Sequence, residues 1–161
     1  MNITKWNELY ENNKRLDKIF IDKYQSDTKL FEKNCIELLV EISEFVNETK
    51  VFKYWSVKTP NKDKMLEEYA DVITMILTFS ELKNMKIKEK YKSYDMNLLD
   101  IIHELYSYSV KLRDDFNELI IEEIFSLVLD FGKKLNFSEN DIIEAIKNKQ
   151  KIIENRLNSD Y

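Results

Sequence analysis

The sequence predicts an all-α fold, a bundle of about six helices that forms a single domain over residues 1–161. Apolar residues recur at three- and four-residue spacing through most of the chain, which is the pattern of amphipathic helices that share one core. Only one Gly (Gly132) and one Pro (Pro60) occur, so tight hairpins and glycine-rich phosphate loops lack the residues they need. A chain of this length buries roughly 68–70% of its unfolded surface, enough for a core without disulfides or structural metal.

Six helices are predicted in an order set by apolar spacing and by capping residues. The first two helices are predicted from the apolar period alone. The third follows Pro60 and can be capped by Asn61. Asp95 can cap the fourth and Ser138 the sixth, because these side chains accept hydrogen bonds from free backbone N–H groups. The fifth is predicted to end near Gly132, where basic residues suit a helix C-terminus. The predicted spans are 4–23, 28–50, 62–83, 95–111, 114–135 and 139–157.

Acidic residues exceed basic ones, with 30 Asp+Glu against 25 Lys+Arg and a net charge of −5. This balance argues against a nucleic-acid partner or an anionic membrane, because both attract basic surfaces. The lysine-rich stretch 83–92 is therefore predicted to be a solvated loop. No apolar run approaches the ~18 residues of a membrane-spanning helix and no signal sequence is recognisable, so we expect a cytoplasmic protein. The single Cys35 fits a reducing compartment and is predicted to be a small buried residue.

The second predicted helix carries a row of acidic residues within an otherwise apolar surface. At about 100° per residue, four glutamates fall within one stripe roughly 60° wide. Val40 borders the stripe on one side and Phe45 on the other, so the stripe is enclosed by apolar side chains. A half-buried row of like charges needs cations or protonation. The four residues are Glu37, Glu41, Glu44 and Glu48.

The third predicted helix aims two further acids into the protein. Its apolar arc covers about two-thirds of the circumference. Glu68 projects inside this arc and Asp71 lies at its edge, and burial without a partner would cost several kcal/mol. In an antiparallel hairpin this pair can face Glu41 and Glu44. Oxygen ligands without His or Cys select hard cations, and Mg²⁺ is held by a few carboxylates together with substrate phosphates. The residues therefore predict Mg²⁺-dependent phosphate chemistry.

The stretch from Glu37 to Ser56, followed by Leu66 to Asp71, resembles the dimeric all-α dUTPases. The pattern E-x-x-E…E-x-x-D also belongs to the wider MazG-like pyrophosphatases. Asn47-Glu48 followed by Phe-Lys-Tyr-Trp-Ser is narrower and looks like dUTPase.

Two segments near the ends of the chain resemble further motifs of that family. Leu16-Asp17 is similar to a Q-x-x-L-D motif, with Asn13 in place of Gln. The residues from Lys149 to Arg156, together with Tyr161, resemble a K-x-x-x-N-x-x-R…Y segment.

The resemblance implies that a set of acids holds two or more Mg²⁺ ions, with Glu48 as an additional ligand or an acid behind the ligands. It also implies that Glu41 or Glu44 takes the proton of the attacking water. The implied metal ligands are Glu41, Glu44, Glu68 and Asp71. The implied substrate-binding residues are Asn13, Lys53, Trp55, Lys149 and Arg156. Because Trp55 lies in a loop before Pro60, we expect it in the nucleotide pocket rather than in the core.

The function implied by the resemblance is hydrolysis of dUTP, and also of dUDP, to dUMP with release of pyrophosphate or phosphate. The implied assembly is a homodimer, and the wide apolar arc of the third helix also favours one. A MazG-like pyrophosphatase with another nucleotide preference is an alternative hypothesis. A helical interaction module without enzymatic activity is an alternative of another class.

Overall fold

The computed structural model describes residues 1–24 and 27–159, and within these residues it is all-helical, as predicted. Each predicted helix is present, and its ends lie within four residues of the prediction. No helix in this part of the chain is both long and apolar enough to cross a membrane. The helices are α1 (Ile3–Tyr24), α2 (Leu30–Thr49), α3 (Lys62–Leu82), α4 (Leu98–Lys111), α5 (Glu118–Lys134) and α6 (Glu139–Asn158).

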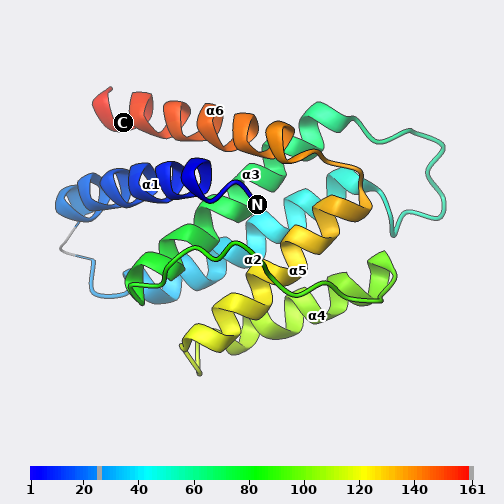
Figure 1. Cartoon of the computed structure of the whole chain (residues 1–161), viewed down its shortest axis with the longest axis horizontal. Helices are drawn as coiled ribbons and strands as arrows, with labels where there is room; N and C mark the ends of the chain where they lie inside the picture. Colours follow the sequence, from blue (N-terminus) through cyan, green and yellow to red (C-terminus); the bar gives the residue numbers. More distant parts are fainter. Residues whose placement is uncertain (25–26, 160–161) are drawn as a thin grey trace.

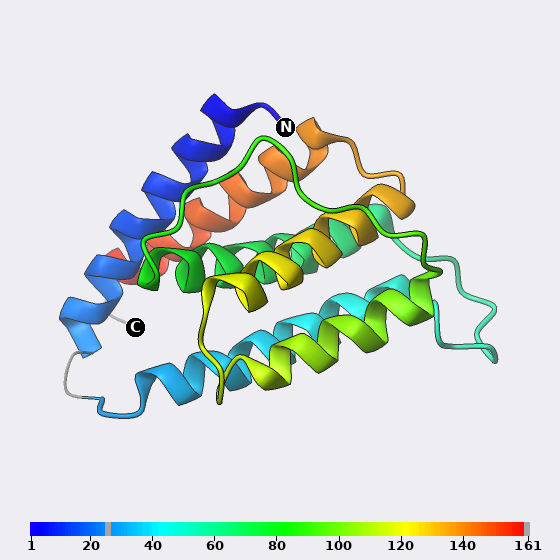
Figure 2. The same ribbon diagram turned by 60° about the horizontal axis from the view of Figure 1, so that its bottom comes forward.

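The helices pack in three layers of two, shown in Figure 1 and, turned by 60°, in Figure 2. The middle layer is formed by α3 and α5. The pair α1 and α6 covers one side of it, and α2 and α4 cover the other. The central helix α3 contacts α1, α2, α5 and α6. This position explains its wide apolar arc, because a helix surrounded by neighbours must be apolar on most of its faces.

Two of the three predicted N-caps are confirmed. The side chains of Asn61 and Ser138 each accept a hydrogen bond from the backbone N–H three residues ahead. The prediction for Asp95 is wrong, because α4 begins after Asn97, whose side chain makes the capping bond instead. Asn117 likewise caps α5, which therefore begins four residues later than predicted. Asn, Asp and Ser side chains near a helix start compete for the same role, so spacing alone does not choose among them.

Gly132 lies two residues before the end of α5, as predicted. The left-handed residue after this helix is Asn136, with φ of 60°. Gly132 also lies against Tyr69 of α3. A Cβ atom at this position would lie 2.7 Å from the hydroxyl oxygen of Tyr69. That hydroxyl donates a 3.0 Å hydrogen bond to the carbonyl of Val128, so the absence of a side chain at Gly132 allows the two helices to meet.

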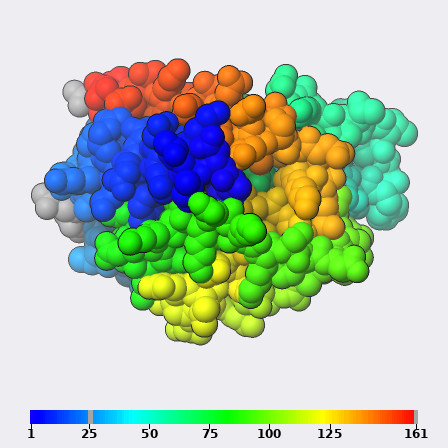
Figure 3. Space-filling model, viewed as in Figure 1, coloured from blue at the N-terminus to red at the C-terminus, as the bar shows by residue number. Residues whose placement is uncertain are grey.

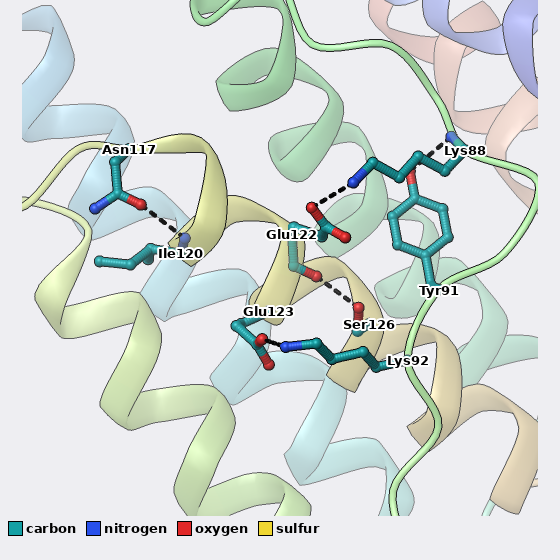
Figure 4. Close-up of polar contacts among 8 residues, drawn as sticks. All are labelled: Lys88, Tyr91, Lys92, Asn117, Ile120, Glu122, Glu123 and Ser126. Atoms are coloured by element: carbon teal, nitrogen blue, oxygen red, sulfur yellow. Dashed lines mark hydrogen bonds and ion pairs between the residues drawn. The ribbon is translucent and has the colours of Figure 1, made fainter.

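The lysine-rich stretch is part of a strap, residues 83–97, that crosses α5 and joins α3 to α4. The stretch is a loop with exposed lysines, as predicted, and two of these lysines also pair with acids of α5 (Figure 4). Lys88 Nζ lies 2.6 Å from Glu122, and Lys92 pairs with Glu123. Ile87 of the strap is buried, and this apolar anchor brings the lysines against the helix. Figure 3 shows the strap filling the surface between α1 and the α4–α5 turn.

Candidate active site

Three carboxylates from two helices converge where α2 packs against α3. Carboxylate oxygens of Glu41, Glu44 and Glu68 all lie within 4.8 Å of one another. Beneath them, the ring of Phe45 packs edge-on against that of Tyr69, with 5.2 Å between the ring centroids, and both rings are fully buried. This aromatic contact holds the two helices in the register that brings their acids together. Carboxylate oxygens at this spacing suit a hard divalent cation.

Asp71 lies beside this cluster but is buried, with only 7% of its surface exposed. Its Oδ1 atom is 2.5 Å from the ammonium nitrogen of Lys149 in α6. Burial raises the pKa of Asp71, whereas the charge of Lys149 opposes this rise. A buried carboxylate without a cation is strongly unfavourable. The structure thus brings two residues that the sequence predicted, one as a metal ligand and one as a substrate contact, into direct contact.

A cavity of about 660 Å³ opens beside Asp71, between α1, α2, α3 and α6. Its lining includes the charged residues Glu41, Asp71 and Lys149, together with apolar side chains of α1, α2 and α6. Arg156 lies seven residues after Lys149 on α6 and also lines the cavity. A cavity lined by both charged and apolar side chains suits a ligand with an anionic part and a flat, uncharged part.

A hydrogen-bonded network forms part of the wall between α1 and α3. Asp17 Oδ2 accepts hydrogen bonds from Asn13 Nδ2 at 2.9 Å and from the hydroxyl of Thr78 at 2.8 Å. The same amide nitrogen also lies 3.4 Å from the carbonyl of Thr74. Among the described residues no donor reaches Asn13 Oδ1, so the amide oxygen is the part of this side chain left to meet a ligand. Burial, opposed by these hydrogen bonds, raises the pKa of Asp17 to about 6.

The acidic row of α2 is divided between two depressions. Glu37 and Glu41 line the cavity, whereas Glu44 and Glu48 face an adjoining open groove of about 530 Å³ on the other side. Glu68 of α3 also lines this groove. Glu48 lies 3.9 Å from the ammonium group of Lys50 and is not part of the three-carboxylate cluster.

Two predicted substrate-binding residues lie away from the cavity in this chain. Trp55 is 63% exposed in the loop between α2 and α3, and its ring packs edge-on against Tyr54 at 5.0 Å between centroids. Lys53 lies over the ring of Phe52, 5.5 Å from its centroid. Neither Lys53 nor Trp55 lines the cavity or the groove. The exposed position of Trp55 agrees with the expectation that it is not a core residue. Tyr161 lies outside the described residues.

Asp17, Glu37 and Thr78 line the cavity but were not predicted as site residues. Glu37 was visible as a member of the acidic row, one turn before Glu41. Asp17 was visible in the Leu-Asp motif, four residues after Asn13. Thr78 carried no signal in the sequence, because its role depends on the packing of α1 against α3.

The mutual repulsion of these acids predicts how the stability of the metal-free protein depends on pH. Burial, and then the charges of Asp71 and Glu44, raise the pKa of Glu41 to about 7, whereas Glu titrates near pH 4.3 in an unfolded chain, to within about one unit. The ionised form is therefore disfavoured in the folded state. The free-energy cost that the ionised Glu41 imposes on the folded state is absent below about pH 4.3 and fully present above about pH 7. The metal-free protein is expected to melt at a higher temperature at pH 5.5 than at pH 8.

Differential scanning calorimetry in EDTA measures this difference, and Glu41→Gln is the variant that isolates one carboxyl. The amide cannot ionise, so the difference between pH 5.5 and pH 8 should shrink in the variant. A wild-type melting temperature that rises from pH 5.5 to pH 8 without metal would show that the acids do not repel one another.

A model of the dUTPase family matches residues 5–161, a span that includes the acid cluster, the cavity and all six helices. No curated protein matches the chain. The chain therefore belongs to the dUTPase family, and it is a nucleotide hydrolase.

Proposed function

We propose that this protein is a Mg²⁺-dependent dUTP diphosphatase that also accepts dUDP, and that it releases dUMP with pyrophosphate or phosphate. The observation that carries the proposal is the convergence of Glu41, Glu44 and Glu68 within 4.8 Å, next to a cavity lined by charged and apolar side chains. The family match supports dUTP hydrolysis in general. The all-carboxylate donor set supports Mg²⁺, because hard cations prefer oxygen ligands.

Four acids would hold the metal, namely Glu41, Glu44, Glu68 and Asp71, with Glu48 as a further ligand or an acid behind them. Bound Mg²⁺ would make a water nucleophilic at neutral pH and would neutralise charge on the leaving pyrophosphate, and two or more ions suit this chemistry. One of Glu41 and Glu44 accepts the proton of the attacking water.

Two cations of α6 are proposed to bind the phosphates. Lys149 pairs with Asp71 at 2.5 Å, and both residues line the cavity, so the ammonium group already lies beside a proposed metal ligand. Metal bound to Asp71 would compete for the same carboxylate and free Lys149 for the phosphates. Arg156 lines the cavity on the same helix, and a guanidinium can bind phosphate oxygens through two parallel hydrogen bonds.

Asn13 is proposed to recognise the base. Its amide nitrogen is held by Asp17 and Thr78, which fixes the amide and leaves its oxygen as an acceptor. Uracil carries a hydrogen on N3 that this oxygen can accept, whereas cytosine presents a lone pair there. A site built around a hydrogen bond rejects a ligand that cannot make it by a large factor, because a polar group is then left unpaired.

Trp55 is proposed to contact the nucleotide, and Lys53 its phosphates. The exposed indole supports this role, because its face is free to stack on a ligand. Trp55→Ala is expected to raise KM for dUTP roughly tenfold, in line with the ~1–3 kcal/mol that base stacking contributes. The melting temperature should change little, since the side chain is 63% exposed. Steady-state kinetics and thermal unfolding separate the two effects, and a normal KM would remove Trp55 from the binding site.

The assembly is proposed to be a homodimer, located in the cytoplasm. Large apolar side chains remain exposed on α2 and α4 in the single chain, which supports association. The buried single thiol of Cys35 agrees with a reducing compartment.

A nucleotide panel tests the proposed activity. Pyrophosphate release from dUTP, dTTP, dCTP and dATP is measured with Mg²⁺ and with EDTA. We expect dUTP to be hydrolysed far faster than the others and only with Mg²⁺. Equal rates on several nucleotides would favour a MazG-like pyrophosphatase of another preference, and full activity in EDTA would reject the metal.

A further inference from the structure

We propose that Asp17 is a positioning residue that sets the preference of the site for uracil over cytosine. It acts by fixing the side-chain amide of Asn13 in one of its two orientations. The inference rests on the role in base recognition proposed above for Asn13. It adds the residue that determines which atom of this amide faces the base.

Asn13, Asp17 and Thr78 form a closed triangle of hydrogen bonds between α1 and α3. Asn13 Nδ2 lies 2.9 Å from Asp17 Oδ2 and 3.1 Å from Thr78 Oγ1. Thr78 Oγ1 lies 2.8 Å from the same Asp17 oxygen, so all sides of the triangle are within hydrogen-bond distance. Asn13 is buried, with 3% of its surface exposed, so the orientation of its amide is set by these neighbours rather than by bulk water.

The carboxylate of Asp17 allows only one direction of bonding around this triangle. Burial raises the pKa of Asp17 to about 6, so at pH 8 the group is ionised. An ionised carboxylate accepts hydrogen bonds and donates none. Thr78 therefore donates its hydroxyl proton to Asp17, and the atom of the Asn13 amide that lies against Asp17 is the NH₂ group. The second hydrogen of this group then points to the Thr78 oxygen.

The carbonyl of Thr74 favours the same orientation. It lies 3.4 Å from Asn13 Nδ2, and a backbone carbonyl can only accept hydrogen bonds. If the amide turned over, its oxygen would face both this carbonyl and the carboxylate of Asp17. In the part of the chain that the structure describes, no donor reaches Asn13 Oδ1. Because Asn13 lines the cavity, this oxygen is the atom left for a ligand.

Uracil and cytosine differ at the atom that this oxygen would meet. Uracil carries a hydrogen on N3, which Oδ1 can accept. N3 of cytosine carries a lone pair, which would face the lone pairs of Oδ1, whereas an amide NH₂ group in the same place would favour cytosine. Thymine carries the same N3–H as uracil, so the orientation of Asn13 separates cytosine from the other two bases only.

The substitution Asp17→Asn keeps the shape of the side chain and removes the constraint on direction. With its oxygen toward the triangle, the new amide keeps the native arrangement. With its NH₂ group there, it donates to Thr78 and to Oδ1 of Asn13, and the Asn13 nitrogen turns toward the ligand. Both arrangements satisfy the triangle, so the variant should populate both. The Thr74 carbonyl still favours the native one, so the preference for uracil should weaken rather than invert.

Binding of dUMP, dCMP and dTMP at pH 8 in EDTA tests the inference without metal or hydrolysis. NMR chemical-shift titration of the ¹⁵N-labelled protein gives the three dissociation constants. We expect the wild type to bind dUMP roughly a hundredfold or more tightly than dCMP, and Asp17→Asn roughly tenfold or less. The ratio of dUMP to dTMP should not change, whereas a merely structural role would weaken all three nucleotides alike. The control is Asp22→Asn, the same change at an exposed position of α1, which should keep the wild-type ratios.

A second variant, Asp17→Ser, repeats the test if Asp17→Asn does not fold, because a hydroxyl can also donate or accept. A folded variant that keeps the wild-type ratio of dUMP to dCMP would overturn the role of Asp17 alone. A wild type that does not prefer dUMP to dCMP, or that binds neither, would overturn this inference together with the proposed role of Asn13. Hydrolysis of dUTP is measured separately on the wild type, and its absence beside an intact preference for dUMP would overturn the proposed activity alone.

Discussion

Replacing Asp71 by Asn is expected to lower kcat for dUTP on the order of several hundred-fold or more while the protein stays folded. A preorganised charged group at a reacting phosphate is commonly worth a loss of this size. Asn keeps the shape of the side chain but removes the charge that a metal would need. The substitution also removes a buried carboxyl whose pKa is raised by burial, so the metal-free variant should be at least as stable as the wild type.

The control for this prediction is Glu144→Gln, which makes the same type of change on the exposed face of α6. Steady-state kinetics with saturating Mg²⁺ and thermal unfolding in EDTA give the two measurements. The Glu144 variant should match the wild type in both. Near-normal Mg²⁺-dependent turnover in the Asp71 variant would contradict its assignment as a metal ligand.

Replacing Gly132 by Ala is expected to destabilise the fold by about 2–4 kcal/mol. The new Cβ would lie 2.7 Å from Tyr69 Oη and 2.9 Å from Cζ, closer than such atoms approach. The ring is held edge-on by Phe45 and Phe137, with centroids 5.2 and 5.4 Å away, so it cannot move aside freely. Overpacking costs typically 1–3 kcal/mol and loss of the buried hydroxyl bond a further ~1–3 kcal/mol, against a gain of about 1 kcal/mol for Ala in a helix.

Thermal unfolding of Gly132→Ala is best compared with the same change in a Tyr69→Phe background. Without the hydroxyl the closest clash disappears, so the Ala substitution should cost less in that background. At ~2–4 °C per kcal/mol for a chain of this size, the single variant should melt several degrees lower. An equally stable or more stable Gly132→Ala would mean that the close approach of α3 and α5 is not required.

The six helices could be predicted because the apolar period is local and survives in the sequence. The same apolar period predicted that Glu41 and Glu44 face Glu68. When the apolar faces of the two helices are buried against each other, their acids also turn toward each other. Both inferences required only the sequences of single helices or of two helices that follow each other in the chain.

Other features depend on segments far apart in the chain and left no local signal. Lys149 meets Asp71 across 149 − 71 = 78 residues, and the cavity wall depends on how α1 crosses α3. The docking of the strap through Lys88 also could not be predicted, because its partner Glu122 lies on another element. The position of Gly132 near a helix end could be predicted, but its contact with Tyr69 could not, because Tyr69 lies on another helix.

The central claim is that a water activated at the α2–α3 acids attacks the α-phosphate of dUTP. Turnover of dUTP with Mg²⁺ in ¹⁸O-labelled water, followed by mass spectrometry of both products, tests this claim most directly. The account predicts one ¹⁸O atom in the dUMP and none in the pyrophosphate at release. Label in the released pyrophosphate or phosphate instead of dUMP, or no turnover with Mg²⁺, would contradict it.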